Sequence, residues 1–156
     1  MTHDLIKEIG YKNFVSAVRD KMTTMPGVLG KNPFPLKHSF AEGLYIREIF
    51  IPKGHLCIGG GHYDSYVNFV VSGDMSIITE EGVNRVKGPQ MIVSPAGSQR
   101  MGYSHEDTVW VTVHANVDNE RDLDILDKRL HYDDYVPAEK IEDNLEVKVE
   151  ELCHLS

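Results

Sequence analysis

Four polar or ionisable side chains lie at alternating positions in the segment GGGHYDSYVNFVV. They are His62, Asp64, Tyr66 and Asn68. Because residues two apart on a β-strand point to the same face, the spacing predicts that an imidazole, a carboxylate, a phenol and an amide share one face. Polar groups are costly to bury without partners, so on an interior face they must satisfy one another, water or a ligand. The segment is therefore a candidate ligand-binding surface.

A second segment, GPQMIVSPAGSQR, adds a permanent cation, because Arg100 follows the turn Pro95-Ala96-Gly97. An arginine binds a carboxylate or phosphate through two parallel hydrogen bonds. The leading hypothesis is a small-molecule, anionic ligand held by Arg100 and lined by the four alternating residues. Two other interpretations stay open: a polar core whose members satisfy one another, and a strand that faces water.

Histidines in both halves of the chain also permit a metal. His62 and His114, with Asp64 or Tyr66, have the residue types of a site with two histidines and an oxygen ligand. Such a site suits a divalent metal (Fe, Mn, Ni or Zn) and leaves positions open for substrate. A metal-dependent oxygenase, isomerase or lyase is therefore the alternative function, although no catalytic residue is assigned. The second alternative is a structural or partner-interaction module with a packed interior.

Nucleophilic catalysis has little support in the sequence. Cys57 lies in a predicted strand, where a buried inert thiol is expected. Cys57 and Cys153 are far apart in a chain expected to be cytosolic, which favours free thiols over a disulfide. No GxSxG motif is present, and the triplet Gly59-Gly60-Gly61 lacks the lysine of a phosphate-binding loop. We expect this triplet to form a lip or bulge where another segment or a ligand approaches the backbone closely.

Short β-strands must position these residues. Runs rich in β-forming residues are separated by Gly/Pro turns, with no helices between them, which predicts an antiparallel barrel rather than a parallel α/β fold. The expected strands cover residues 44–51, 66–71, 75–79, 84–87, 91–94 and 109–114.

Two helical segments flank the strands. Residues 2 to about 22 form an amphipathic pattern that Gly10 can split, and residues 121–130 place Leu123, Leu126 and Leu130 on one face. Prolines predict irregular chain over residues 23–43. The sequence thus predicts a single domain, with a helix and wrapping loop (1–43), a barrel (44–117), and a helix with an acidic tail (118–156). The alternating piece 145–152 fits an edge strand, a swapped arm or a tail.

The net charge and hydropathy of the chain argue against some classes of binding partner. A net charge of −8 argues against nucleic-acid binding, which relies on clustered Lys and Arg. No apolar run approaches the roughly 20 residues of a membrane helix, and the N-terminus does not have the pattern of a signal peptide, so we expect a cytoplasmic protein. The apolar stripe of the first helix must be buried on the barrel or on a second subunit, and we expect a homo-oligomer.

The order of glycines and turns resembles the cupin superfamily over the stretch from Gly54 to His114. The matching residues are Gly54, Gly60-Gly61-His62, Tyr66 and Gly73 in a first block, and Gly88, Pro95-Ala96-Gly97 and Arg100 in a second. The resemblance implies a cupin-like antiparallel β-barrel (jelly roll) with an N-terminal helix and a short C-terminal helix. The sequence is also similar to small cupin-like proteins encoded in phage genomes.

The family's metal ligands are only partly present. Where cupins have three histidines and a glutamate, this chain has Gly60, His62, Tyr66 and Arg100. Arg100 replaces a ligand with a cation, which repels a divalent metal. The resemblance therefore implies the fold and a degenerate form of the family's metal motif.

Overall fold

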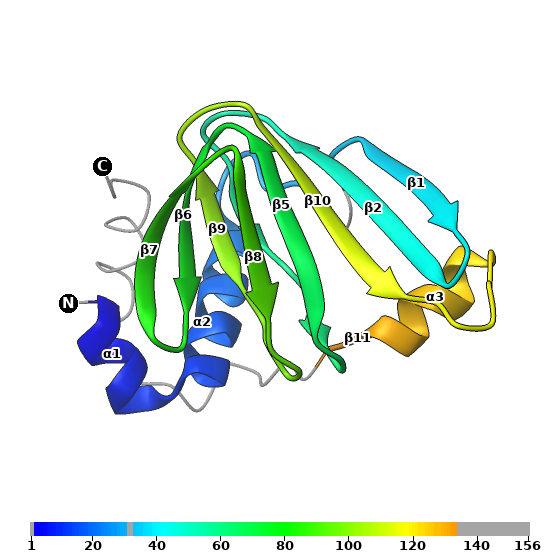
Figure 1. The fold of residues 1–156 in the computed structure, drawn as a ribbon. Coiled ribbons are helices and arrows are strands. Elements are labelled where there is room, and N and C mark those ends of the chain that lie inside the picture. The colour runs from blue at the N-terminus through cyan, green and yellow to red at the C-terminus, as the bar shows by residue number, and fades with distance from the viewer. Residues whose placement is uncertain (1, 31–32, 134–156) are drawn as a thin grey trace.

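Two antiparallel β-sheets form the body of the protein in this computed structural model, which describes residues 2–30 and 33–133 (Figure 1). The larger sheet has the strand order β1 (Leu36–Ala41), β2 (Leu44–Ile51), β10 (Thr108–Ala115), β5 (Tyr66–Ser72) and β8 (Gln90–Ser94). The smaller sheet has the order β3 (Leu56–Ile58), β9 (Met101–Ser104), β6 (Asp74–Thr79) and β7 (Gly82–Lys87). A two-stranded pair joins β4 (Gly61–His62) to β11 (His131–Tyr132). The predicted antiparallel β architecture is confirmed.

The space between the two sheets holds the main apolar core. Its buried members are Ile51, Val70, Met75, Ile77, Val86 and Trp110. They follow the alternation of the strands: Thr108, Trp110 and His114 of β10 are buried, whereas the odd-numbered residues between them are only half-buried. The interior therefore carries polar groups from the same strands that build the core.

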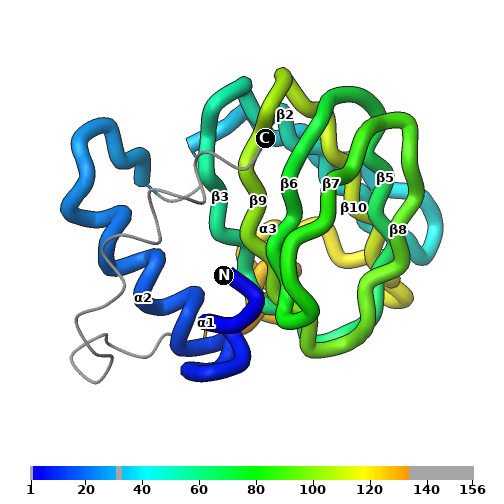
Figure 2. The backbone as a smooth tube through the Cα atoms, turned by 90° about the vertical axis from the view of Figure 1, so that its left-hand side faces the viewer, coloured from blue at the N-terminus to red at the C-terminus, as the bar shows by residue number. Residues whose placement is uncertain are grey.

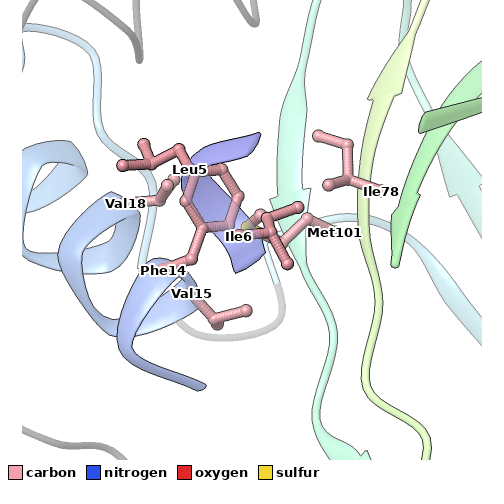
Figure 3. Packing of buried hydrophobic residues seen from close by; sticks show 7 residues of the cluster. All are labelled: Leu5, Ile6, Phe14, Val15, Val18, Ile78 and Met101. Carbon is pink, nitrogen blue, oxygen red and sulfur yellow. The ribbon is translucent and has the colours of Figure 1, made fainter. Parts of the chain in front are cut away.

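Two helices pack on part of the outer face of the smaller sheet. The chain forms α1 (Thr2–Ile9) and α2 (Tyr11–Thr24), separated at Gly10, whose φ of 82° lies outside the helical region. The apolar stripe of these helices packs on Ile78 and Met101 of β6 and β9 (Figure 3). Figure 2 shows α2 beside β3, with the smaller sheet facing the viewer. The predicted helical segment is thus present as two helices, and its stripe is buried on its own barrel.

The first strand lies where the sequence predicts irregular chain. Residues 36–41 lie within the stretch for which prolines predict irregular chain, yet they form β1 and pair with β2 from Leu36↔Ile49 to Ala41↔Leu44. Pro33 and Pro35 precede the strand and so cost it no ladder hydrogen bond. The edge position of β1 is set by this pairing, which is not visible in the local sequence.

A short helix, α3 (Leu123–Leu130), follows the last long strand. Asp122 caps its start, accepting hydrogen bonds from the backbone of Asp124 at 2.9 Å and Ile125 at 3.2 Å. Leu126 and Leu130 pack against Tyr45 and its neighbour Phe40, as the predicted apolar face requires. Leu123, expected on that face, is 42% exposed because it occupies the first turn, which lies beyond the sheet.

None of the described helices is long and apolar enough to cross a membrane. The alternating segment 145–152, predicted as a strand, arm or tail, lies outside the described residues.

Candidate functional site

Three histidines from three distant parts of the chain converge between the sheets. His62 lies on β4, His114 near the end of β10, and His131 on β11. One nitrogen from each ring can act as a ligand atom, and these three atoms all lie within 4.8 Å of one another. We call these residues the histidine cluster. It is the only group of three or more His, Cys, Asp or Glu side chains with metal-ligand spacing within residues 2–30 and 33–133.

Backbone pairing brings His131 into the cluster. Immediately after α3 the chain becomes extended at His131, with φ of −116°, and pairs with β4 so that His131 faces His62. A hydrogen bond of 3.1 Å from the backbone N–H of Tyr63 to the carbonyl of Leu130 extends this pairing. Figure 1 shows α3 and β11 at the end of the barrel where β10 finishes. The C-terminal helix therefore positions one residue of the cluster.

The turn after β8 holds β4 from the other side. The backbone N–H of His62 donates to the carbonyl of Ser98 at 3.0 Å, and the backbone N–H of Gly97 donates to the carbonyl of His62 at 2.8 Å. The turn Pro95-Ala96-Gly97, which the sequence marks as a motif, thus fixes the backbone on which His62 sits.

Tyr66 orders the rings of the cluster. It is buried, and its ring stacks on His62 with a centroid distance of 3.8 Å and on His114 at 5.1 Å. The rings of His62 and His114 are nearly parallel, 5.3 Å apart, whereas the ring of His131 stands at 80° to that of His62. The predicted site residues His62, Tyr66 and His114 therefore do lie together.

Burial keeps two imidazoles of the cluster in their neutral form. It is the main reason why the pKa of His62 falls to about 3 and that of His114 to about 4. The neighbouring His131 lowers both pKa values further, as does Arg47. Nε2 of His114 is buried and has no hydrogen-bond partner within the part of the chain that the structure describes. A neutral imidazole with an unpaired nitrogen is the form that ligates metals.

Asp127 fixes the orientation of the third ring. Its carboxylate lies 2.8 Å from Nδ1 of His131, one helical turn earlier in the chain. When Nδ1 carries the proton and donates it to this carboxylate, Nε2 is the nitrogen with the lone pair. A carboxylate behind a ligating histidine is the usual outer partner in metal sites, since it sets the tautomer and increases the basicity of the ring.

The glycine triplet makes room for β11. A Cβ atom on Gly61 would lie 2.3 Å from the ring of Tyr132, so only glycine fits there. A Cβ atom on Gly60 would contact the Cβ and ring of His131 at 3.6 to 3.7 Å. The expected close approach at the triplet is thus the approach of β11. His131 also packs beside the position where the cupin pattern has its first histidine.

Two predicted lining residues do not join the cluster. The chain bends at residues 63–65, between β4 and β5, which breaks the alternation, and Asp64 is exposed. Asn68 is buried, but its amide nitrogen donates to Ser94 Oγ at 2.7 Å and to a backbone carbonyl, and its oxygen accepts from Trp110 at 3.0 Å. Asn68 is therefore part of a polar core whose members satisfy one another.

Arg100 remains a candidate for binding an anion. It precedes β9, on which Met101 faces the helices while a Cβ on Gly102 would face Met75 and Ile77 in the core. Burial raises the pKa of Tyr11 on α2 and the charge of Arg100 partly offsets this, so Arg100 lies near α2 as well as near His62. Nη1 of Arg100 is buried without a hydrogen-bond partner among the described residues, and the positive charge of Arg100 contributes to lowering the pKa of His62.

Cys57 fits the expectation of an inert thiol. It packs against the core between the sheets, and burial raises its pKa to about 12. Cys153 lies outside the described residues.

The sequence interpretation missed His131. Its position follows from the pairing of β11 with β4, which joins residues far apart in the chain. A local signal was present, because Asp127 and His131 are four residues apart at the end of a predicted helix, the spacing that lets a carboxylate reach an imidazole.

Together the two facing sheets, the flanking helices and the Pro-x-Gly turn define a cupin-like β-barrel. The chain is similar in fold to a cupin-2 domain containing protein from Shewanella frigidimarina, at 13% identity over 63% of this chain and 91% of that one, with a TM-score of 0.46. It is similar to a Cupin 2 conserved barrel domain protein from Salinispora arenicola, at 12% identity over 56% of this chain and 82% of that one, with a TM-score of 0.49. A cupin domain from Bordetella pertussis matches at 17% identity, over 56% of this chain and 98% of that one, with a TM-score of 0.45. These likenesses concern the fold alone.

No family model matches the sequence, and no curated protein matches it.

Proposed function

We propose that this protein binds one divalent metal ion through His62, His114 and His131. The observation that carries the proposal is the convergence of three ligand nitrogens within 4.8 Å of one another. In addition, Nε2 of His114 is buried without a hydrogen-bond partner among the described residues. Two nitrogens at metal-bonding distance of one zinc lie about 3.4 Å apart, so small rotations of the rings would close the cluster on an ion.

The donor set fits a metal in three respects. Three imidazoles suit Zn, Fe or Ni better than Ca or Mg, which prefer oxygen ligands. His62 and His114 are neutral at pH 7, because burial lowers the pKa of each. The unprotonated ring nitrogen of each can therefore bind a metal without displacing a proton. Asp127 supplies the outer carboxylate that a ligating His131 needs.

The proposed ligands, His62, His114 and His131, differ from the three histidines and one glutamate of the cupin pattern. Of the four positions of the cupin pattern, only His62 has a metal-ligating imidazole, and Gly60 leaves the space beside which His131 packs. His131 would thus do the work of the missing first histidine, delivered from β11. His114 and Tyr66 complete the surroundings from the larger sheet.

Metal-dependent catalysis is the function that this site would allow. Three protein ligands leave coordination positions for water or substrate, and a bound metal there would polarise a substrate oxygen or acidify a water. Tyr66 stacks on two of the rings and restricts their rotation. Whether the reaction is that of an oxygenase, an isomerase or a lyase depends on the substrate.

Binding of a small anion is the second candidate function, and the buried Nη1 of Arg100 favours it. A buried guanidinium N–H group without a partner is costly, so an oxyanion that accepts a hydrogen bond from Nη1 of Arg100 would be stabilised. Thermal unfolding with malonate and with inorganic phosphate tests this function. We expect a rise in melting temperature that Arg100→Ala abolishes and Arg100→Lys reduces; an equal rise in Arg100→Ala rules out Arg100 as the anchor.

Elemental analysis of protein purified without a histidine tag, followed by titration of the metal-free form with Zn²⁺ and Ni²⁺, tests the metal site. We expect about one ion per chain, and a large loss of affinity in His131→Ala. His3→Ala is the matched control, because His3 is exposed on α1. Binding that survives in His131→Ala, or that falls equally in His3→Ala, contradicts the proposal.

A further inference from the structure

The outer face of the larger sheet is apolar from one strand to the next. Residues of β2, β10, β5 and β8 that alternate with the buried ones point away from the barrel, and all but one are hydrophobic. We call this surface the outer face. The exception is Glu48 of β2. The apolar members of the outer face are Leu44, Ile46, Phe50, Val67, Phe69, Val71, Met91, Val93, Val109, Val111 and Val113.

The strand register makes the outer face continuous. Phe69 of β5 is paired with Met91 of β8 on one side and with Val111 of β10 on the other. In the next row, Val67 is paired with Val93 and with Val113. Directly opposed residues lie about 5 Å apart, so the apolar rows are continuous over β8, β5 and β10. On β2 the row through Val67 continues with Ile46, whereas the row through Phe69 ends at Glu48, which is paired with Lys37 of β1.

The two sheets differ in what covers them. On the smaller sheet, Ile78 and Met101 pack under the apolar stripe of α1 and α2 (Figure 3), and the exposed residues of β7 include Arg85 and Lys87. The larger sheet has no such cover within the described residues, and Met91 and Val93 keep 60% and 64% of their surface exposed. A two-sheet barrel normally alternates apolar inward and polar outward residues when one face meets water.

The exposed apolar area of the outer face is large enough to form part of a protein–protein interface. Phe50, Phe69, Val71, Met91 and Val93 are 38 to 64% exposed. With roughly 150–200 Å² of surface for each large side chain, these five alone leave on the order of 400–500 Å² of apolar surface in water. Apolar patches of this size mark interaction sites, and about 800 Å² per partner makes a standard interface. The half-buried valines and the polar rim of the sheet would supply the remainder.

We propose that the outer face is the dimer interface, covered by the same face of a second copy of this chain. A flat apolar sheet is complementary to itself, because two such sheets pack face to face at about 10 Å and about 30°. A two-fold axis through the middle of the face would bury both copies at once. One extended segment could pair only with a sheet edge and could not cover four strands.

The charges also favour a copy of the chain over a membrane surface. The charged residue of the outer face is Glu48, which is paired with Lys37 on the edge strand β1, and the whole chain carries a net charge of −8. Anionic lipid would repel such a molecule, since peripheral binding relies on clusters of Lys and Arg. The apolar middle and the charged edge instead match the core and rim of a protein interface.

Light scattering coupled to size exclusion, run on the full chain from about 1 to 100 μM, tests the proposal. We expect twice the 17.6 kDa of the chain for the wild type. Phe69→Lys should shift the mass to that of one chain, because a desolvated charge in the middle of the interface costs several kcal/mol. Phe69→Leu should remain dimeric. Val93→Lys is a second disrupting variant, in case Phe69→Lys fails to fold.

Val117→Lys is the matched control: it adds the same charge at a residue that is 88% exposed and lies after β10, beyond the sheet. It should stay dimeric. Circular dichroism and metal content monitor the fold of every variant. A wild type with the mass of one chain overturns the proposal, whether residues 134–156 or a different protein cover the face. A dimer that survives both lysine substitutions on the face, or that Val117→Lys also dissociates, overturns it as well.

Discussion

His131 depends on Asp127 for the orientation of its ring. The two side chains meet at 2.8 Å across the last turn of α3, and the carboxylate decides which ring nitrogen carries the proton. In the proposed metal site His131 takes the place of the first histidine of the cupin pattern, so that site would depend on this one hydrogen bond. Asp127 is a positioning residue in this scheme and does not touch the metal.

Asp127→Asn should lower metal affinity by roughly 10- to 100-fold, the usual cost of losing an outer carboxylate. Competition with a chromophoric chelator measures the affinity. Asp124→Asn on the same helix is the control and should bind as tightly as the wild type, since Asp124 is exposed and lies in the first turn of α3, at the end opposite to His131. A merely structural role would lower the melting temperature of the metal-free protein, which we expect to be unchanged.

At the residue scale the sequence predicted part of the cluster. The grouping of His62, Tyr66 and His114 follows from strand alternation and from the closing strand of the barrel, and the structure brings them together. Asp64 was placed wrongly, because strand alternation was extended through residues 63–65, where the chain bends. His131 was missed, since its place depends on contacts between segments far apart in the chain.

The helix α3 couples the fold of the C-terminal segment to the site. Leu126 and Leu130 anchor it against Tyr45, and the next residue is His131. Any change that frays α3 should therefore loosen one ligand while leaving the other two in place. The affinity of the proposed metal site should therefore depend on the stability of α3.

Asp122→Ala removes the cap of α3 and should cost about 1 kcal/mol of stability, because two backbone N–H groups lose their acceptor. Metal affinity should fall as well, whereas Asp122→Ser, which keeps a capping oxygen, should behave like the wild type. Urea unfolding and metal titration of the three proteins provide the check. An Asp122→Ala protein as stable as Asp122→Ser would show that the cap contributes nothing.

The helical cover of the smaller sheet is expected to contribute strongly to stability. Phe14 is 1% exposed and packs with Val15, Ile78 and Met101 (Figure 3). Phe14→Ala should cost about 3–5 kcal/mol, the usual range for emptying a buried aromatic site. Val28→Ala, at a half-exposed position after α2, should change stability by less than about 0.5 kcal/mol. Similar losses in both variants would mean that the helices add little to the fold.

At the element scale, longer strands were predictable and short ones were not. Residues 44–51 match β2 in full, because eight residues give a clear β pattern. The strands β4 and β11 have two residues each, too few for any periodicity, and their pairing is fixed by the glycine triplet and by α3. The strand β1 follows proline-rich chain and takes its structure from β2.

At the scale of the whole molecule, net charge does not describe the surroundings of the histidine cluster. The protein carries a net charge of −8, yet the pKa of His62 is lowered by burial and by nearby His131, His114, Arg47 and Arg100. The acidic exterior favours solubility, whereas the charged side chains among these neighbours are arginines. Net charge alone therefore gave no information about the site.

Two buried neutral imidazoles make the stability of the metal-free protein depend on pH. Their folded-state pKa values, about 3 for His62 and about 4 for His114, lie below the value of about 6.5 expected in the unfolded chain. Between these values the unfolded chain binds more protons than the folded protein. The free energy of unfolding should therefore be highest above pH 6.5 and should fall as the pH drops toward 4, by up to about 1.4 kcal/mol per pH unit for each histidine.

Urea unfolding of metal-free protein at pH 7.5, 6.5, 5.5 and 4.5 would measure this slope. The double variant His62→Gln/His114→Gln should be less sensitive to pH in this window, because glutamine does not titrate. Asp74, whose pKa is lowered mainly by its hydrogen bond with Arg85, should contribute only below about pH 4 and equally in both proteins. Equal slopes for the wild type and the double variant would mean that these histidines are not held neutral by burial, which would remove one support for the metal site.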